Sequence, residues 1–175
     1  HVMIVHLERN VVVPEPIHLV FAADTAAGTL LSSPRMVFCL GENSEATIVE
    51  THVGVDDAPA GSADTDAHCS NVVVDVRLAP DARLTHYKLQ DDTPGAYHLA
   101  SLDVRQAAGS RMVSHLALLG GAVSRQETRV RFDGERAELS LDGLYMPGGR
   151  QVHDNTLFID HVAPNCTSNQ LFKGV

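Results

Sequence analysis

Histidine and cysteine are the residue types in this sequence that could bind a metal ion. Ten histidines and three cysteines (Cys39, Cys69 and Cys166) occur among the 175 residues. No two histidines are separated by one or by three residues, so the short ligand spacings of metal sites, including the His-x-His pair of metal-binding cupins, are missing. His161 and Cys166 lie five residues apart, and on an extended strand such residues point to opposite faces unless Pro164 introduces a bend. The sequence therefore assigns no metal ligand.

Five further histidines are interpreted as structural. In strand-forming sequences, histidines commonly pack at strand ends or pair with neighbouring carboxylates. This interpretation covers His52, His86, His98, His115 and His153.

Two adjacent aspartates, Asp91 and Asp92, precede Thr93-Pro94-Gly95. Paired carboxylates cleave glycosidic bonds in β-helical polysaccharide enzymes, in which an arginine such as Arg105 could share the groove. Adjacent aspartates at a turn are more often turn residues, the first of which accepts backbone hydrogen bonds. We adopt this second interpretation and predict no catalytic residue.

Composition and motifs argue against several functional classes. The net charge is −9 and the isoelectric point is near 5.4, and no basic stripe indicates nucleic-acid binding. No run approaches the roughly 20 apolar residues of a membrane helix, and none resembles a signal peptide. The phosphate-binding Gly-rich motifs and the Gly-x-Ser-x-Gly nucleophile elbow are absent. An odd number of well-separated cysteines favours a reducing compartment, so we expect the protein in the cytoplasm.

Apolar and polar residues alternate along much of the chain, as they do in half-buried strands. Valine, leucine, threonine and tyrosine dominate the alternating segments. The segments are 72–78, 84–89, 99–104, 129–132 and 138–142. The sequence predicts a single all-β domain.

Glycine and proline clusters mark turns between these segments. They fall at Pro80-Asp81, Thr93-Pro94-Gly95, Ala108-Gly109, Gly120-Gly121, Asp133-Gly134 and Pro147-Gly148-Gly149. Alternate clusters are 25–28 residues apart, as expected for two-strand coils of a β-helix. An antiparallel sandwich or jelly roll has turns at similar intervals, so the spacing leaves both architectures open.

Residues 55–70 interrupt this rhythm with a small, polar segment. Its four aspartates lack the ligand order of an EF-hand calcium loop. We predict a flexible insertion here.

Ordered motifs from about Pro16 onward resemble those of the SufB/SufD proteins, the scaffold subunits of the Suf iron–sulfur cluster assembly system. The final segment, 161–174, is the most characteristic, and its Asn-Gln-Leu-Phe-Lys-Gly ending is more similar to the SufD branch. The other matching segments are 16–20, 41–44, 70–72, 88–91, 97–100, 110–111, 119–121, Arg125, 142–145 and 153–155.

The resemblance implies a right-handed parallel β-helix and a non-enzymatic scaffold role. In this family a SufB-like and a SufD-like β-helix associate edge to edge, and each binds a SufC-like ATPase through a helical region. ATP-driven rearrangement then exposes the site at which an iron–sulfur cluster is assembled transiently. Whether a flavin binds the parent complex is undetermined, and cofactor-binding residues are unknown.

The chain is interpreted as a fragment of the SufBD core, because it opens on an apolar run at His1 and stops within a strand-like segment at Val175. The N-terminal and C-terminal helical regions of the family are missing from it. Family cluster ligands are expected beyond Val175, and Cys39, Cys69 and Cys166 match none of them. The fragment is therefore expected to hold no cofactor or cluster.

Two other classes remain as hypotheses. A β-helical carbohydrate-active enzyme would place Asp91, Asp92 or Arg105 in a groove on one exposed face. A metal-binding β-barrel of cupin type would bring several histidines together.

Overall fold

The computed structural model describes residues 2–24, 28–55 and 68–175, and all regular elements in these ranges are strands. They are β1 (Val2–Leu7), β2 (Ile17–Asp24), β3 (Leu30–Ser32), β4 (Arg35–Leu40), β5 (Glu45–Val55), β6 (His68–Leu78), β7 (Arg83–Asp91), β8 (Tyr97–Gln106), β9 (Arg111–Leu118), β10 (Val123–Phe132), β11 (Glu138–Tyr145), β12 (Val152–His161) and β13 (Thr167–Gly174). No helix that could cross a membrane occurs in this part of the chain.

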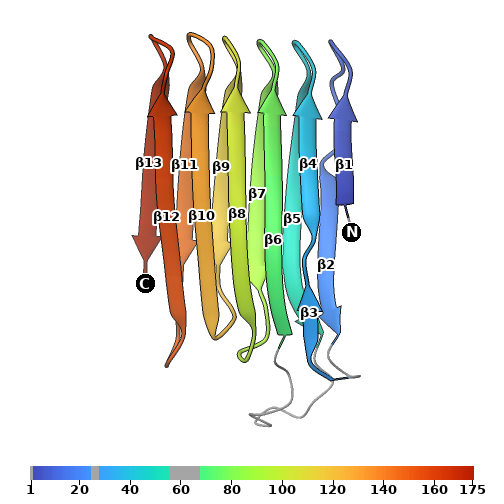
Figure 1. Cartoon of the computed structure of the whole chain (residues 1–175), viewed down its shortest axis with the longest axis vertical. Helices are drawn as coiled ribbons and strands as arrows, with labels where there is room; N and C mark the ends of the chain where they lie inside the picture. The colour runs from blue at the N-terminus through green and yellow to red at the C-terminus, as the bar shows by residue number, and fades with distance from the viewer. Residues whose placement is uncertain (1, 25–27, 56–67) are drawn as a thin grey trace.

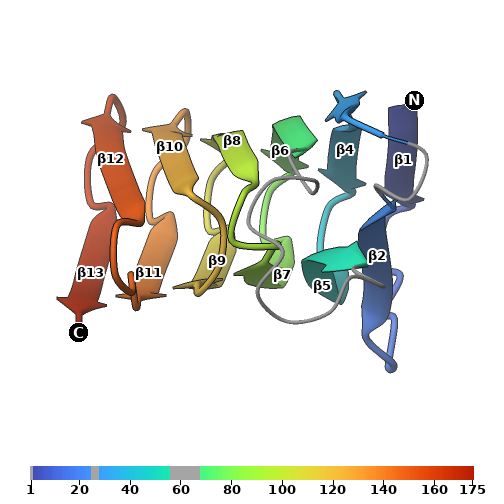
Figure 2. The ribbon, with the colours of Figure 1, turned by 90° about the horizontal axis from the view of Figure 1, so that it is seen from below.

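The strands form two sheets that run side by side along the molecule (Figures 1 and 2). Sheet A has the order β1-β4-β6-β8-β10-β12, with β3 also paired to β6, and sheet B has the order β13-β11-β9-β7-β5-β2. All the named strand pairs are parallel. The prediction of a parallel β-helix is thus confirmed, and the antiparallel sandwich is excluded.

One rung consists of a sheet A strand and the sheet B strand that follows it. In sheet A, Tyr97 pairs with Cys69 and with Val123, and Val123 pairs with Val152, so consecutive rungs lie 28, 26 and 29 residues apart. The predicted interval of 25–28 residues agrees with these rungs. It fails between β4 and β6, where Arg35 pairs with Val73 across 38 residues, because the polar insertion lies in that coil.

The hydrophobic core lies between the sheets and is built from stacked rows of equivalent residues. Phe38, Val76, Val104 and Val130 form one such row, and each is at most 2% exposed. Alternation along each strand sends these residues inward and their neighbours outward. Residues in one row are about 5 Å apart, which is the spacing of hydrogen-bonded strands.

The turns also repeat from rung to rung. Each turn from sheet A to sheet B contains one residue in the left-handed backbone region, with φ between 56° and 68°. These residues are Asn10, Asn43, Asp81, Gly109, Arg136 and Asn165. Asparagine, aspartate and glycine tolerate this conformation best, which explains why the turn signals were readable in the sequence. At the opposite corner, a Cβ atom on Gly120 would lie 2.2 Å from the carbonyl oxygen of Asp92, so only glycine fits.

The predicted insertion at 55–70 needs a correction at its ends. Val55 belongs to β5, and the residues from His68 onward belong to β6, because their alternating side chains pair with strands β3 and β8. The rest of the predicted insertion, 56–67, lies outside the described residues.

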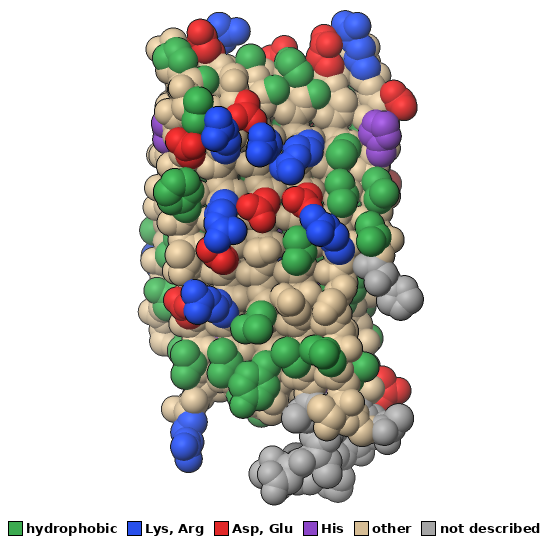
Figure 3. All heavy atoms as spheres, viewed as in Figure 1, with side chains coloured by type: hydrophobic (Ala, Val, Ile, Leu, Met, Phe, Trp, Pro, Cys, Tyr) green, Lys and Arg blue, Asp and Glu red, His purple; other side chains and the backbone are tan. Residues whose placement is uncertain are grey.

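The outer face of sheet A carries interleaved basic and acidic side chains above a band of apolar ones (Figure 3). Arg77, Arg105 and Arg131 stack in one row. Asp133 lies 2.7 Å from Arg131 Nε and 3.8 Å from Arg105, and Asp160 lies 3.6 Å from Arg131. These exposed ion pairs offset the repulsion that stacking like charges would cause.

Two phenylalanines test whether the inward rows carry the stability. Phe38 is fully buried, whereas Phe158 is 63% exposed on the outer face of sheet A. We expect Phe38→Ala to lower the free energy of unfolding by about 3–5 kcal/mol through the cavity it leaves. Phe158→Ala is expected to change it by about 0.5 kcal/mol or less. Urea unfolding followed by circular dichroism measures both, and equal effects would contradict the assignment of faces.

Candidate functional site

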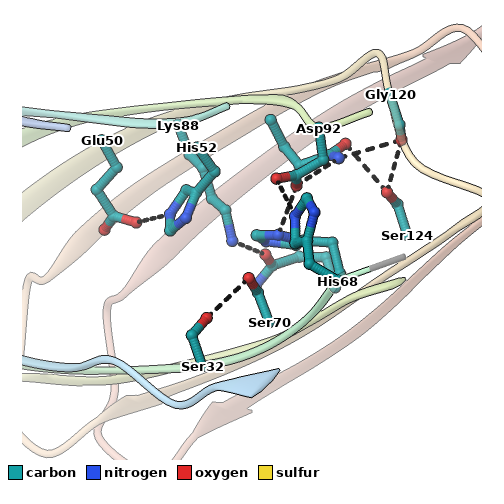
Figure 4. Close-up of polar contacts among 12 residues, drawn as sticks. Ser32, Glu50, His52, His68, Ser70, Lys88, Asp92, Gly120 and Ser124 are labelled. Carbon is teal, nitrogen blue, oxygen red and sulfur yellow. Dashed lines mark hydrogen bonds and ion pairs between the residues drawn. The ribbon is translucent and has the colours of Figure 1, made fainter. Parts of the chain in front are cut away.

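Polar side chains replace apolar ones inside the solenoid toward the end of the sheet B strands (Figure 4). All are buried, and we call them the interior polar cluster. Its members are Glu50, His52, His68, Ser70, His86, Lys88, Gln90, Asp92, His98, Ser114, Ser124 and Gln126. Buried ionisable groups are expensive in an apolar core, so their concentration here marks the candidate site.

Strand alternation and parallel register together build this cluster. On β5, Glu50 and His52 are two residues apart and therefore face the interior together. In the next rung β7 places Lys88 beside Glu50 and Gln90 beside His52. Asp92 continues the inward series directly after β7.

Glu50 is completely buried and is held by two histidines. Its Oε1 lies 2.8 Å from His86 Nε2, and its Oε2 lies 3.3 Å from His52 Nε2. The other ring nitrogen of His86 lies 3.0 Å from Ser114 Oγ. Burial opposes ionisation of Glu50, but the charge of His86 and the hydrogen bonds from both histidines outweigh it, so the pKa of Glu50 is well below its usual range.

Asp92 forms the second carboxylate centre. Its Oδ1 lies 2.9 Å from His68 Nε2, and its Oδ2 accepts a hydrogen bond from Gln90 Nε2 at 2.9 Å and lies 3.0 Å from His98 Nδ1. Burial again opposes the charge, but the contacts to His98, Gln90 and His68 lower the pKa of Asp92 far below normal. Asp92 is therefore ionised at neutral pH.

Lys88 provides the positive charge between these carboxylates. Its Nζ donates to Gln126 Oε1 at 3.0 Å. Burial lowers the pKa of Lys88 to about 8, and the attraction of Glu50 and Asp92 opposes this shift. A closed cavity of about 20 Å³, the size of a water molecule, adjoins Lys88, Gln126 and Ser114.

Two cluster histidines favour their neutral forms. Burial lowers the pKa of His98 to about 4, and the charge of Lys88 adds to this effect against the attraction of Asp92. Burial also lowers the pKa of His52. His98 Nε2 and His68 Nδ1 find no hydrogen-bond partner among the described residues.

The cluster can hold protons and charges, but it is not a ready-made metal centre. Within 2–24, 28–55 and 68–175, no group of three or more His, Cys, Asp or Glu side chains has a geometry that could hold a metal ion. The ionised groups Glu50 and Asp92 carry two negative charges against the one positive charge of Lys88. The interior therefore attracts a further positive charge.

The structure separates the residues that the sequence considered as pairs. Asp91 lies on the exposed face of β7 whereas Asp92 points inward, and Arg105 lies on the outer face of sheet A, so the three share no groove. His161 contacts Ser168 Oγ at 3.1 Å, while Cys166 Sγ contacts the carbonyl oxygen of Gly134.

The histidine interpretation is confirmed for pairing and wrong for position. His52 and His86 pair with Glu50, and His98 pairs with Asp92, but His86 lies within its strand and not at its end. The interpretation of Asp92 as a turn residue was wrong, because its carboxylate lies inside the solenoid. Sequence reasoning missed the cluster as a unit. The inward series His86-x-Lys88-x-Gln90-x-Asp92 was the available signal, and only the core position of Leu84 identifies its face.

Comparison with known proteins agrees with this architecture. The family described as SUF system FeS cluster assembly, SufBD core domain, matches residues 21–175. The chain belongs to the SufBD core family. Its members here include the Escherichia coli iron–sulfur cluster assembly protein SufD, which is 33% identical over 136 residues, covering 78% of this chain and 30% of that protein.

Two longer alignments extend over nearly the whole SufBD core. The iron–sulfur cluster assembly SufBD family protein slr0076 of Synechocystis is 26% identical over 172 residues, covering 97% of this chain and 38% of that protein. The chloroplastic protein ABCI7 of Arabidopsis thaliana is 27% identical over 178 residues, covering 98% and 36%. The chain thus spans about a third of the length of these curated relatives.

The lowered pKa values of His52 and His98 predict acid sensitivity of this SufBD core. Both histidines stay neutral in the folded state, while the unfolded state takes up protons below pH 6.5. The free energy of unfolding should therefore fall as the pH drops from 6.5 to 5, by up to about 1.4 kcal/mol per pH unit for each proton. His98→Gln should reduce this slope in urea unfolding, whereas His115→Gln, on the outer face, should leave it unchanged. Equal slopes for the wild type and His98→Gln would refute the assignment.

Lys88 predicts a second pH dependence, at alkaline pH. Its pKa of about 8 in the folded state lies below the usual 10.5, so the unfolded state holds more protons between these values. Stability should therefore rise as the pH increases from 8 to 10.5. Lys88→Met should remove this rise, and Lys173→Met, at the chain's other, exposed lysine, should retain it. Thermal unfolding across this range measures the effect, and persistence of the rise in Lys88→Met would contradict the burial of this ammonium group.

Proposed function

We propose that this chain is the β-helix core of a SufD-like scaffold subunit that works with a SufB-like subunit and a SufC-like ATPase in iron–sulfur cluster assembly. The observation that carries the proposal is the match of residues 21–175 to the SufBD core, joined to a parallel β-helix over the same residues. Iron and sulfide are the cargo of this process. The role is structural, and it is carried out in the cytoplasm.

The arrangement of polar groups supports a scaffold over a carbohydrate-active enzyme. A glycosidase needs two carboxylates a few ångströms apart that flank one bond in an accessible groove. Asp91 and Asp92 point to opposite faces of β7 and β7's end, and the inward carboxylate is already bound by His68, Gln90 and His98. The histidines of the cupin hypothesis are likewise engaged with carboxylates and not with one another around a common centre.

Open sheet edges support association with a sister β-helix. In the described chain, β12 and β13 are the last strands of sheets A and B, so each has one side without a strand partner. Such edges pair with another chain by strand addition. Thr167 N and Val175 N donate to β11-side carbonyl groups, so by alternation the amide of Gln170 faces the open edge.

Contact with the ATPase is proposed to involve helical regions outside these residues. The cluster ligands are proposed to lie there or on the partner, and Cys39, Cys69 and Cys166 are given no ligand role. A flavin is not assigned.

Binding to a SufB-type subunit tests the proposed role. We expect tagged chain 1–175, co-expressed with a SufB-type and a SufC-type protein, to retain the SufB-type subunit on affinity purification. Gln170→Pro removes the edge-facing amide and should weaken retention about tenfold or more, whereas Gln170→Ala keeps the amide and should bind like the wild type. Circular dichroism checks that both variants are folded. Failure of the wild type to retain the SufB-type subunit, or equal binding by the two variants, would count against edge pairing.

A further inference from the structure

A cleft opens between β2 and β3 and reaches the interior polar cluster. Its volume is about 460 Å³, within the range of small-molecule sites. Its apolar walls come from Phe21, Ala22 and Ala23 on one side and from Leu30, Leu31 and Pro34 on the other. Its polar lining comes from Ser32, Ser33, His52, Ser70 and Asp92. Apolar walls with a few convergent polar groups are the usual composition of a ligand pocket.

The polar floor of the cleft offers acceptors. Asp92 is ionised, and two of its three bonded neighbours share Oδ2, which leaves Oδ1 with one neighbour, His68. His52 directs Nε2 toward the carboxylate of Glu50, so its neutral ring keeps Nδ1 as an acceptor. Ser32 and Ser70 add two hydroxyl groups, 3.0 Å apart (Figure 4).

The electrostatics of the cleft favour a cation. No lysine or arginine lines it. Behind its floor, the negative charges of Glu50 and Asp92 exceed the positive charge of Lys88. An aromatic surface is also present, because the rings of Phe21 and His52 stack with centroids 4.8 Å apart and planes 10° apart. Aromatic faces attract cations, most strongly where water is excluded.

We propose that this cleft binds a small organic cation, with an ammonium or amidinium head directed at Asp92, His52 and Ser70 and an apolar body between β2 and β3. The head donates hydrogen bonds to the acceptors of the floor and balances the excess negative charge. The body contacts Phe21 and Leu30. This binding site is separate from the open edge of β12 and β13, which lies at the other end of both sheets.

Two other ligand classes fit the cleft less well. An anion would meet the carboxylate of Asp92 with no lysine or arginine in the lining to offset the repulsion. A metal ion would need three ligands in a suitable geometry, which no group within the described ranges provides.

Binding of benzamidine and 2-phenylethylamine to chain 1–175 tests the proposal, with benzoate and phenylacetate as anions of matched size. Isothermal titration calorimetry at pH 7.5 and low salt should detect both cations and neither anion. Asp92→Asn should weaken cation binding about tenfold or more, as expected when a hydrogen bond to a charged group is lost. Ser33→Trp, at an exposed residue of the lining, should fill the cleft and abolish binding, whereas Ser140→Trp, on the outer face of sheet B, should not.

The Ser33→Trp and Ser140→Trp pair keeps the test decisive if Asp92→Asn fails to fold. Absence of binding by both cations, equal binding of cations and anions, or undiminished binding to Ser33→Trp would overturn the proposal. Titration with Zn²⁺ or Fe²⁺ alone provides a further arm. Stoichiometric metal binding that excludes benzamidine would replace the organic cation by a metal ion.

Discussion

Parallel, in-register stacking of rungs is the constraint on which the rest of this structure depends. Each side chain lies about 5 Å from the residue at the same position of the next rung, so one substitution is felt along a whole row. Rows of valine and phenylalanine therefore build the core with few residue types, as Phe38, Val76 and Val104 do. The left-handed turn residues repeat for the same reason, and Asn43 Nδ2 donates to Asn10 Oδ1 in the rung below, at 3.0 Å.

Stacking also explains how charged residues can enter the interior together. A single buried carboxylate between apolar rows would be neutralised or would destabilise the fold. Here β5 and β7 place Glu50 next to Lys88, and the sheet opposite supplies His98. Carboxylates, lysine and histidines thus satisfy one another across rungs and across sheets. A network of this kind behaves as a unit, so removal of any one member affects the protonation of the others.

The sequence carried most of the fold and little of the site. Strand alternation and turn residues such as Asp81 and Gly109 are local, so the rungs and their interval could be predicted. Parallel pairing is non-local, and the spacing alone left a sandwich equally open until the motif resemblance favoured the β-helix. The cluster was beyond reach because Asp92 and His68 meet only after β6 and β7 fold onto opposite sheets. Local reasoning therefore placed Asp92 in a turn.

Assembly and charge storage occupy different parts of the molecule. The open strands β12 and β13 present backbone groups to a partner, and their inward side chains are only partly covered. The interior polar cluster lies in the rungs of β5 to β10 and opens toward β2 and β3 through the cleft. Since the two regions share no side chain, changes at the edge should alter partner binding without altering the acid dependence of stability. Changes in the cluster should do the reverse, unless the rungs between them transmit strain, which their rigid parallel packing would make visible as coupling between the two measurements.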